Sequence, residues 1–148
     1  MMRLFSIFFV GLMLASCSTY NDEEKNQFDD KIEAYLKRKK IKCERSSSGL
    51  YYKILNPGEG DVIQLKDEVS FTYKGKLLSG KLFDEKKEPV TFQVQQLIGG
   101  WKEVMLHLRP GGKAFLVCPP QLGYGEHDLE SIPPNSILVF ELEVKSVR

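Results

Sequence analysis

Residues 89–101 read Pro-Val-Thr-Phe-Gln-Val-Gln-Gln-Leu-Ile-Gly-Gly-Trp, and this stretch joins a strand pattern directly to a helix pattern. From Pro89 to Val94, β-prone apolar residues alternate with polar ones, which predicts a short strand. After the paired glycines, apolar residues recur at the spacing of one helix face, at Trp101, Val104, Met105 and Leu108. The pattern ends before Pro110, which cannot continue a helix. We therefore expect a short strand followed at once by one short buried helix.

Strand patterns flank this helix on both sides. The expected strands cover residues 49–55, 67–78, 81–84, 89–94, 113–117 and 136–147. In the second of these, Val69, Phe71 and Tyr73 alternate with polar positions and therefore share one face. A hairpin turn is expected at residues 79–80 and a charged loop at residues 85–88. Many strands and one helix predict an α+β fold, with an antiparallel sheet of five to six strands wrapped around the helix.

The N-terminus has the pattern of a signal peptide, which we assign to residues 1–16. Arg3 precedes an apolar run over residues 4–15, and this run is shorter than the roughly 20 residues needed to span a bilayer. Residues 14–17 read Leu-Ala-Ser-Cys, which resembles the lipobox of bacterial lipoproteins. The resemblance implies that Cys17 becomes an acylated N-terminus, carrying palmitate among its chains, that anchors the protein without spanning the membrane. No acidic residue follows Cys17 directly, which favours the outer membrane of the cell envelope.

Residues 17–48 are expected to form the lipid anchor, an amphipathic helix and a linker. The charged segment 21–42 carries one apolar stripe at helical spacing, made of Phe28, Ile32, Tyr35 and Leu36. One narrow stripe buries little surface, so we interpret the helix as a solvated spacer between membrane and domain. The alternative is a helix for docking or for a weak dimer contact through the same stripe. A polar, Ser-rich segment over residues 43–48 ends this region, and the folded domain is expected over residues 49–148.

Composition and spacing argue against several classes of function. Without the signal peptide the net charge is near zero, which does not favour a nucleic-acid partner. His107 and His127 lie at no spacing typical of a metal site, and neither accompanies a nucleophile motif. Cys43 and Cys118 are too few for a disulfide framework, so we expect two unpaired thiols.

Short motifs in a fixed order carry more information than any single residue. They are Tyr73-Lys-Gly75, Phe83-Asp84, Phe92-Gln-Val94, Ile98-Gly-Gly-Trp101, Pro119-Pro120, Leu122-Gly-Tyr-Gly125, Ile132-Pro-Pro-Asn135 and Leu138-Val-Phe140. Together they resemble the FKBP-type prolyl cis-trans isomerases from Gly49 to Val147, and residues 89–101 resemble the macrophage-infectivity-potentiator branch in particular.

The resemblance implies an aromatic pocket with an indole floor. Carried over position by position, the catalytic residues are Tyr73, Phe83, Asp84 and Tyr124, and the substrate-binding residues are Leu97, Ile98, Trp101, Ile132 and Phe140. The backbone N–H of Ile98 and the hydroxyl of Tyr124 are implied as donors to the bound peptide. This sequence departs from many members in the charged residues 85–88, in Val90, and in the acidic residues at 126, 128 and 130, all near the expected rim.

The implied chemistry is rotation about an X-Pro amide. Its barrier of about 18–20 kcal/mol comes from amide resonance, so an apolar pocket that prefers the twisted amide needs no cofactor. We expect a peptidyl-prolyl isomerase that acts on proline-containing, unfolded or partly folded exported polypeptides. The alternative is a non-catalytic envelope lipoprotein that binds proline-containing peptides or assembles with them, and the two functions share every pocket residue.

Overall fold

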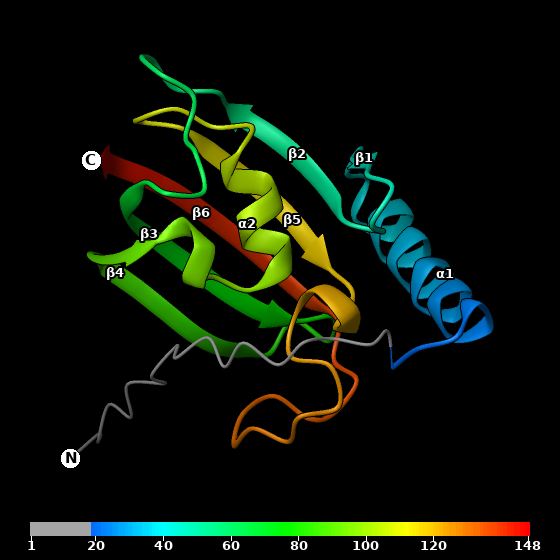
Figure 1. The fold of residues 1–148 in the computed structure, drawn as a ribbon. Helices are drawn as coiled ribbons and strands as arrows, with labels where there is room; N and C mark the ends of the chain where they lie inside the picture. The colour runs from blue at the N-terminus through cyan, green and yellow to red at the C-terminus, as the bar shows by residue number, and fades with distance from the viewer. Residues whose placement is uncertain (1–18) are drawn as a thin grey trace.

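The computed structural model describes residues 19–148, in which six strands form one antiparallel sheet (Figure 1). Along the chain the elements are α1 (Asp22–Lys39), β1 (Glu44–Arg45), β2 (Tyr51–Asn56), β3 (Glu68–Leu77), β4 (Leu82–Gln93), η1 (Val94–Gln96), α2 (Gly99–Met105), β5 (Lys113–Cys118), η2 (Pro120–Leu122) and β6 (Leu138–Val147). The strand order is β1-β2-β5-β6-β3-β4. The predicted α+β fold is therefore confirmed. The signal peptide and Cys17 lie outside the described residues.

The inner face of the sheet is covered by α2, and the main core lies between them. Burial alternates along β3 as the sequence pattern predicted, with Val69, Phe71 and Tyr73 all buried. The predicted apolar face is buried as well: Trp101, Val104 and Met105 lie in α2, and Leu108 lies just beyond its end. The helix also sits close to β5 at Gly100, where any Cβ would collide with the Sγ of Cys118. Glycine at this position therefore fixes how closely helix and sheet approach.

The charged segment 85–88 is not the loop expected between two strands, because it lies within the continuous strand β4. The register shows how the strand accommodates it: Phe71 pairs with Val90, whereas Tyr73, only two residues on, pairs with Lys86. The extra residues form a bulge. The alternation of apolar and polar residues fails here because β4 is an edge strand, where charged side chains reach water. Such charges also protect the unpaired edge of the sheet from pairing with another strand.

The predicted N-terminal helix is present as α1, and its boundaries have clear causes. Asn21 and Glu24 form a reciprocal capping box at its start, and Lys40 closes it in a left-handed conformation. Acidic residues occupy the first turn and basic residues the last, as the helix dipole favours. No helix among residues 19–148 has the length and apolar character needed to cross a membrane.

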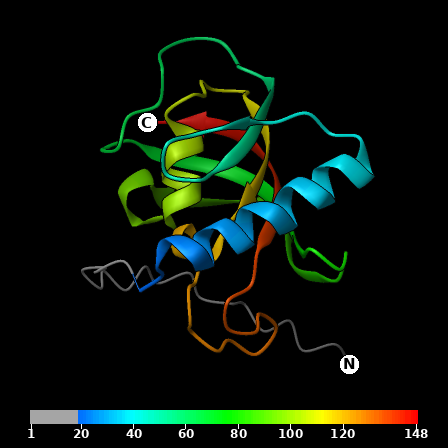
Figure 2. The ribbon, with the colours of Figure 1, turned by 90° about the vertical axis from the view of Figure 1, so that its right-hand side faces the viewer.

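The apolar stripe of α1 is buried against the outer face of the sheet, on the side opposite α2 (Figure 2). Phe28, Ile32 and Leu36 are buried in a second core cluster. Its members from the sheet are Tyr51, Phe115, Val117 and Val139, and Ile137 joins it from just before β6. The interpretation of α1 as a solvated spacer is therefore wrong. The stripe is already covered by the sheet of the same chain, so it is not exposed for a dimer contact or for docking to another protein. The physical reason is that β5 is apolar on both faces and that Tyr51 and Val139 extend its outer apolar patch, so this part of the sheet needs a second cover.

Candidate active site

Four aromatic rings from separate elements meet between the sheet and α2. Trp101 of α2 lies at the centre, with its ring centroid 4.8 Å from that of Tyr73 on β3 and 4.9 Å from that of Phe140 on β6. The ring of Phe83 on β4 lies 5.6 Å from that of Phe140. All three contacts are close to edge-on, the arrangement that aromatic quadrupoles favour. We call these four residues the aromatic cluster.

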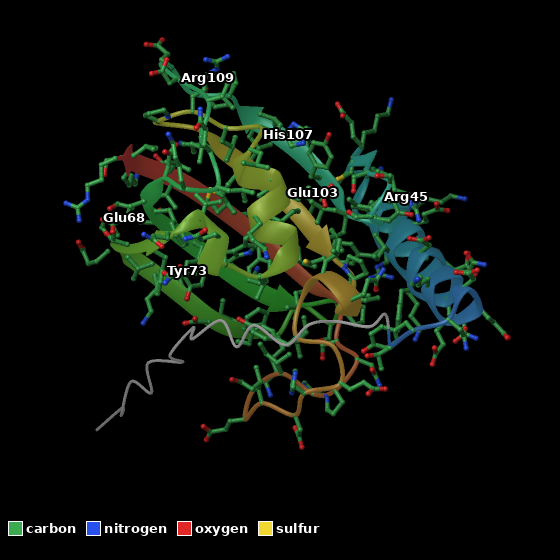
Figure 3. All side chains as sticks on the ribbon, viewed as in Figure 1. Arg45, Glu68, Tyr73, Glu103, His107 and Arg109 are labelled. Atoms are coloured by element: carbon green, nitrogen blue, oxygen red, sulfur yellow. The ribbon has the colours of Figure 1, made fainter. Side chains whose placement is uncertain are left out.

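A polar pair lies at the edge of the aromatic cluster. The hydroxyl of Tyr73 donates a hydrogen bond to Oδ2 of Asp84, and the half-buried carboxylate comes from the strand next to β3. Burial raises the pKa of Tyr73, and the bond to Asp84 raises it further. The phenol therefore stays protonated through the physiological range and keeps a donor on the carboxylate. Figure 3 shows Tyr73 on the side of the sheet that α2 covers.

Gly75 gives the cluster its close packing, and sequence reasoning did not single it out as a site residue. A Cβ at this position would lie 2.6 Å from Cζ of Phe83 and 2.8 Å from Cε1 of Phe140, closer than real Cβ contacts approach. Gly75 pairs with Asp84 in the β3·β4 ladder and with Phe140 in the β3·β6 ladder. Both rings therefore lie over the bare backbone of β3, and the Tyr73-Lys-Gly75 motif is the signal that pointed to this position.

The connection from η2 to β6 brings two further predicted residues to the cluster. Ile132 is 1% exposed and belongs to the main core, and Tyr124 is half-buried against it. Burial raises the pKa of Tyr124, and the nearby Tyr73 and Asp84 raise it further. The phenol of Tyr124 therefore stays protonated through the physiological range and keeps its donor. A short bridge between Leu129 and Ile132 shapes the intervening turn.

The remaining predicted residues lie where η1 leads into α2. Leu97 is buried in the main core, and Ile98 is half-buried at the N-cap of α2. The structure thus brings together all nine predicted side chains: eight in or against the main core, and Asp84 through its bond to Tyr73. The acidic residues at 126, 128 and 130 are exposed on the connecting loop, as expected for a rim.

Access to the cluster is narrow, because Trp101 is only 1% exposed. The predicted site residues Asp84, Ile98 and Tyr124 are half-buried, so they reach nearer to the surface than Trp101 does. An open hollow of about 460 Å³ lies over β3, β4, β5 and β6; most of its lining residues are charged, and Tyr73 is also among them. No group of His, Cys, Asp or Glu in residues 19–148 is arranged to hold a metal ion.

An antiparallel sheet with an aromatic cluster under one covering helix, and a tyrosine–aspartate pair at its edge, defines a domain of the prolyl isomerase type. The model of the family described as FKBP-type peptidyl-prolyl cis-trans isomerase matches residues 60–145. The chain belongs to this family.

Named relatives agree with that assignment. A "Probable FKBP-type peptidyl-prolyl cis-trans isomerase" of Haemophilus influenzae is 46% identical over 142 residues, which cover 93% of this chain and 58% of the relative. The "Peptidyl-prolyl cis-trans isomerase Mip" of Coxiella burnetii is 36% identical over 80% of this chain and 54% of its own length. The crystal structure of FkpA from Escherichia coli superposes with a TM-score of 0.73 at 36% identity, over 85% of this chain and 63% of that one. The chain thus spans about half the length of the curated relatives it matches, from 43% to 58%.

Proposed function

We propose that the chain is a peptidyl-prolyl cis-trans isomerase that acts on X-Pro bonds of unfolded or partly folded polypeptides. The observation that carries the proposal is the polar pair of Tyr73 and Asp84 at the edge of the aromatic cluster. Rotation about the amide breaks no covalent bond, so the protein has only to bind the twisted amide more tightly than the planar one. This rotation requires no cofactor, because twisting the bond transfers no electrons or groups.

The residues divide this work between them. The aromatic faces take up the pyrrolidine ring and exclude water, which removes solvent stabilisation of the planar, strongly dipolar amide. The carboxylate of Asp84, held in place by the hydroxyl of Tyr73, presents negative charge beside the rotating carbonyl carbon. The hydroxyl of Tyr124 and the N–H of Ile98 are proposed to bind the peptide on either side.

Replacing Tyr73 by phenylalanine in the full chain is expected to lower kcat/KM for an X-Pro peptide about five- to tenfold, because Asp84 loses its donor. Asp84→Asn is expected to lower it at least as much, and the double variant should lose less than the product of the two losses. A protease-coupled isomerisation assay in detergent measures all three variants.

The matched control is Tyr52→Phe, which removes an exposed hydroxyl that donates to Glu44 of β1 and takes no part in the polar pair. Its rate should equal that of the unaltered chain. An unaltered chain that binds X-Pro peptides but leaves their isomerisation at the uncatalysed rate would replace the isomerase with the non-catalytic peptide-binding function.

We further propose that the protein is a lipoprotein of the cell envelope, anchored through Cys17 in the outer membrane and acting on exported polypeptides. The signal-peptide pattern over residues 1–16 and the Leu-Ala-Ser-Cys sequence at its end support this. Cells expressing the chain should incorporate labelled palmitate into it and should fail to do so with Cys17→Ser. Equal labelling of both proteins would refute the anchor, and fractionation of the two membranes tests its location.

A further inference from the structure

Tyr20, two residues before α1, connects the N-terminal segment to the loop that carries part of the candidate active site. Its side chain is 6% exposed, and its ring packs edge-on against Phe28 with 5.2 Å between centroids. Its hydroxyl donates a 2.6 Å hydrogen bond to Oδ1 of Asn135, 115 residues further along the chain. Figures 1 and 2 both place the start of α1 beside the η2–β6 connection.

Asn135 is the residue at which this loop closes. Its backbone N–H donates to the carbonyl of Gly125 at 2.8 Å, which joins the two ends of the segment 125–135. Its φ of 61° lies in the left-handed region, which asparagine tolerates better than most residues. A Cβ on Gly125 would lie 3.7 Å from the Tyr20 hydroxyl, so that hydroxyl lies beside both ends of the loop.

The loop needs such support because its middle is exposed and charged. Glu126, Asp128 and Glu130 all face solvent, and they repel one another along a short segment. The site residues Tyr124 and Ile132 come from the two limbs of the same loop. Where these two side chains lie relative to Trp101 therefore depends on how firmly the base of the loop is held.

We propose that Tyr20 is a positioning residue of the active site, which acts through Asn135 to hold the loop in the conformation that binds peptide. The inference rests on the proposed isomerase function. Without the Tyr20 hydroxyl the loop samples other conformations. The apparent affinity for peptide then falls in proportion to the fraction of molecules whose loop keeps the binding conformation. Once peptide is bound, the aromatic cluster and the polar pair are unchanged, so the rate of rotation is retained.

The test compares Tyr20→Phe with Tyr51→Phe in the full chain. Both variants keep a buried ring and remove one hydroxyl, but that of Tyr51 binds Glu33 of α1 and lies away from the loop. Tyr20→Phe is expected to raise KM about three- to tenfold and to change kcat less than about twofold. Amide hydrogen exchange at Ile132 and Asn135 should accelerate by a similar factor. The Tyr51 variant should leave both readouts at their original values.

Asn135 supplies the reciprocal arm of the experiment. Asn135→Asp retains an acceptor oxygen and should keep KM near the original value, whereas Asn135→Gly retains the backbone conformation, loses the acceptor and should match Tyr20→Phe. The pair Tyr20→Phe and Asn135→Gly should be non-additive. Unchanged KM and unchanged exchange in Tyr20→Phe would overturn the inference. If the unaltered chain does not isomerise X-Pro bonds, the proposed function fails. The role of Tyr20 is then still decided by two measurements, amide hydrogen exchange and the dissociation constant for an X-Pro peptide.

Discussion

Ile32→Asp is expected to lower the free energy of unfolding by about 3–5 kcal/mol, as buried, unpaired charges do. Ile32 is 0% exposed at the centre of the stripe by which α1 packs on the outer face of the sheet. A carboxylate there has to stay in an apolar contact or lift the helix off the sheet. Lifting α1 exposes the apolar positions of β2, β5 and β6 that it covers. Urea unfolding followed by circular dichroism measures the loss.

The matched control is Lys31→Asp, which places the same side chain on the exposed side of the same helix turn. Its effect should stay within about 0.5 kcal/mol. A fragment that begins at Ser46 tests the contact in another way, because it leaves the outer face uncovered and should associate or precipitate. If the two aspartate variants are equally stable and the fragment stays monomeric, the helix does not contribute to the fold.

Gly75→Ala is expected to lower kcat/KM about 10- to 100-fold, the range expected when the reacting geometry is displaced by about 1 Å. The new methyl group would lie 2.6 Å from Phe83 and 2.8 Å from Phe140, so both rings must move off β3. Asp84 follows Phe83 directly in the chain and pairs with Gly75, so its carboxylate moves away from Tyr73 as well. The isomerisation assay and the affinity for an X-Pro peptide should both report the change.

A second variant separates displacement of the site from loss of stability. Adding Phe83→Leu to Gly75→Ala removes the ring that the methyl group would strike first, and this should restore part of the unfolding free energy. Activity should stay low, because the aromatic cluster is then incomplete. Full activity in Gly75→Ala would show that the two rings do not form part of the site.

Much of the fold and the membership of the site could be predicted from the sequence, because both depend on local pattern. Alternation identified the inner face of β3, helical spacing identified α2, and the ordered motifs identified the residues that now surround Trp101. The bulge in β4 escaped prediction, because an edge strand can carry consecutive charges that break alternation. A run of charged residues therefore indicates contact with solvent, but it does not distinguish a loop from an edge strand.

Contacts between segments far apart in the chain could not be predicted from the sequence either. The stripe of α1 was visible in the sequence, but its partner was not, because the outer-face residues of β5 and β6 appeared simply as apolar strand positions. Tyr20 and Gly75 have roles that exist only through residues far along the chain, Asn135 in one case and Phe140 in the other. A single sequence holds no direct record of such pairs.

The close approach of Gly100 to Cys118 has a kinetic consequence. The thiol is fully buried beneath α2, its Sγ donates to the carbonyl of Leu122, and burial raises its pKa. A thiol reagent therefore reaches Cys118 only while the segments that cover it, among them α2 and η2, move away from β5, and the rate of modification measures how often that opening happens. Since α2 also carries Trp101, the modification rate of this native cysteine reports transient opening next to the aromatic cluster, without an engineered label.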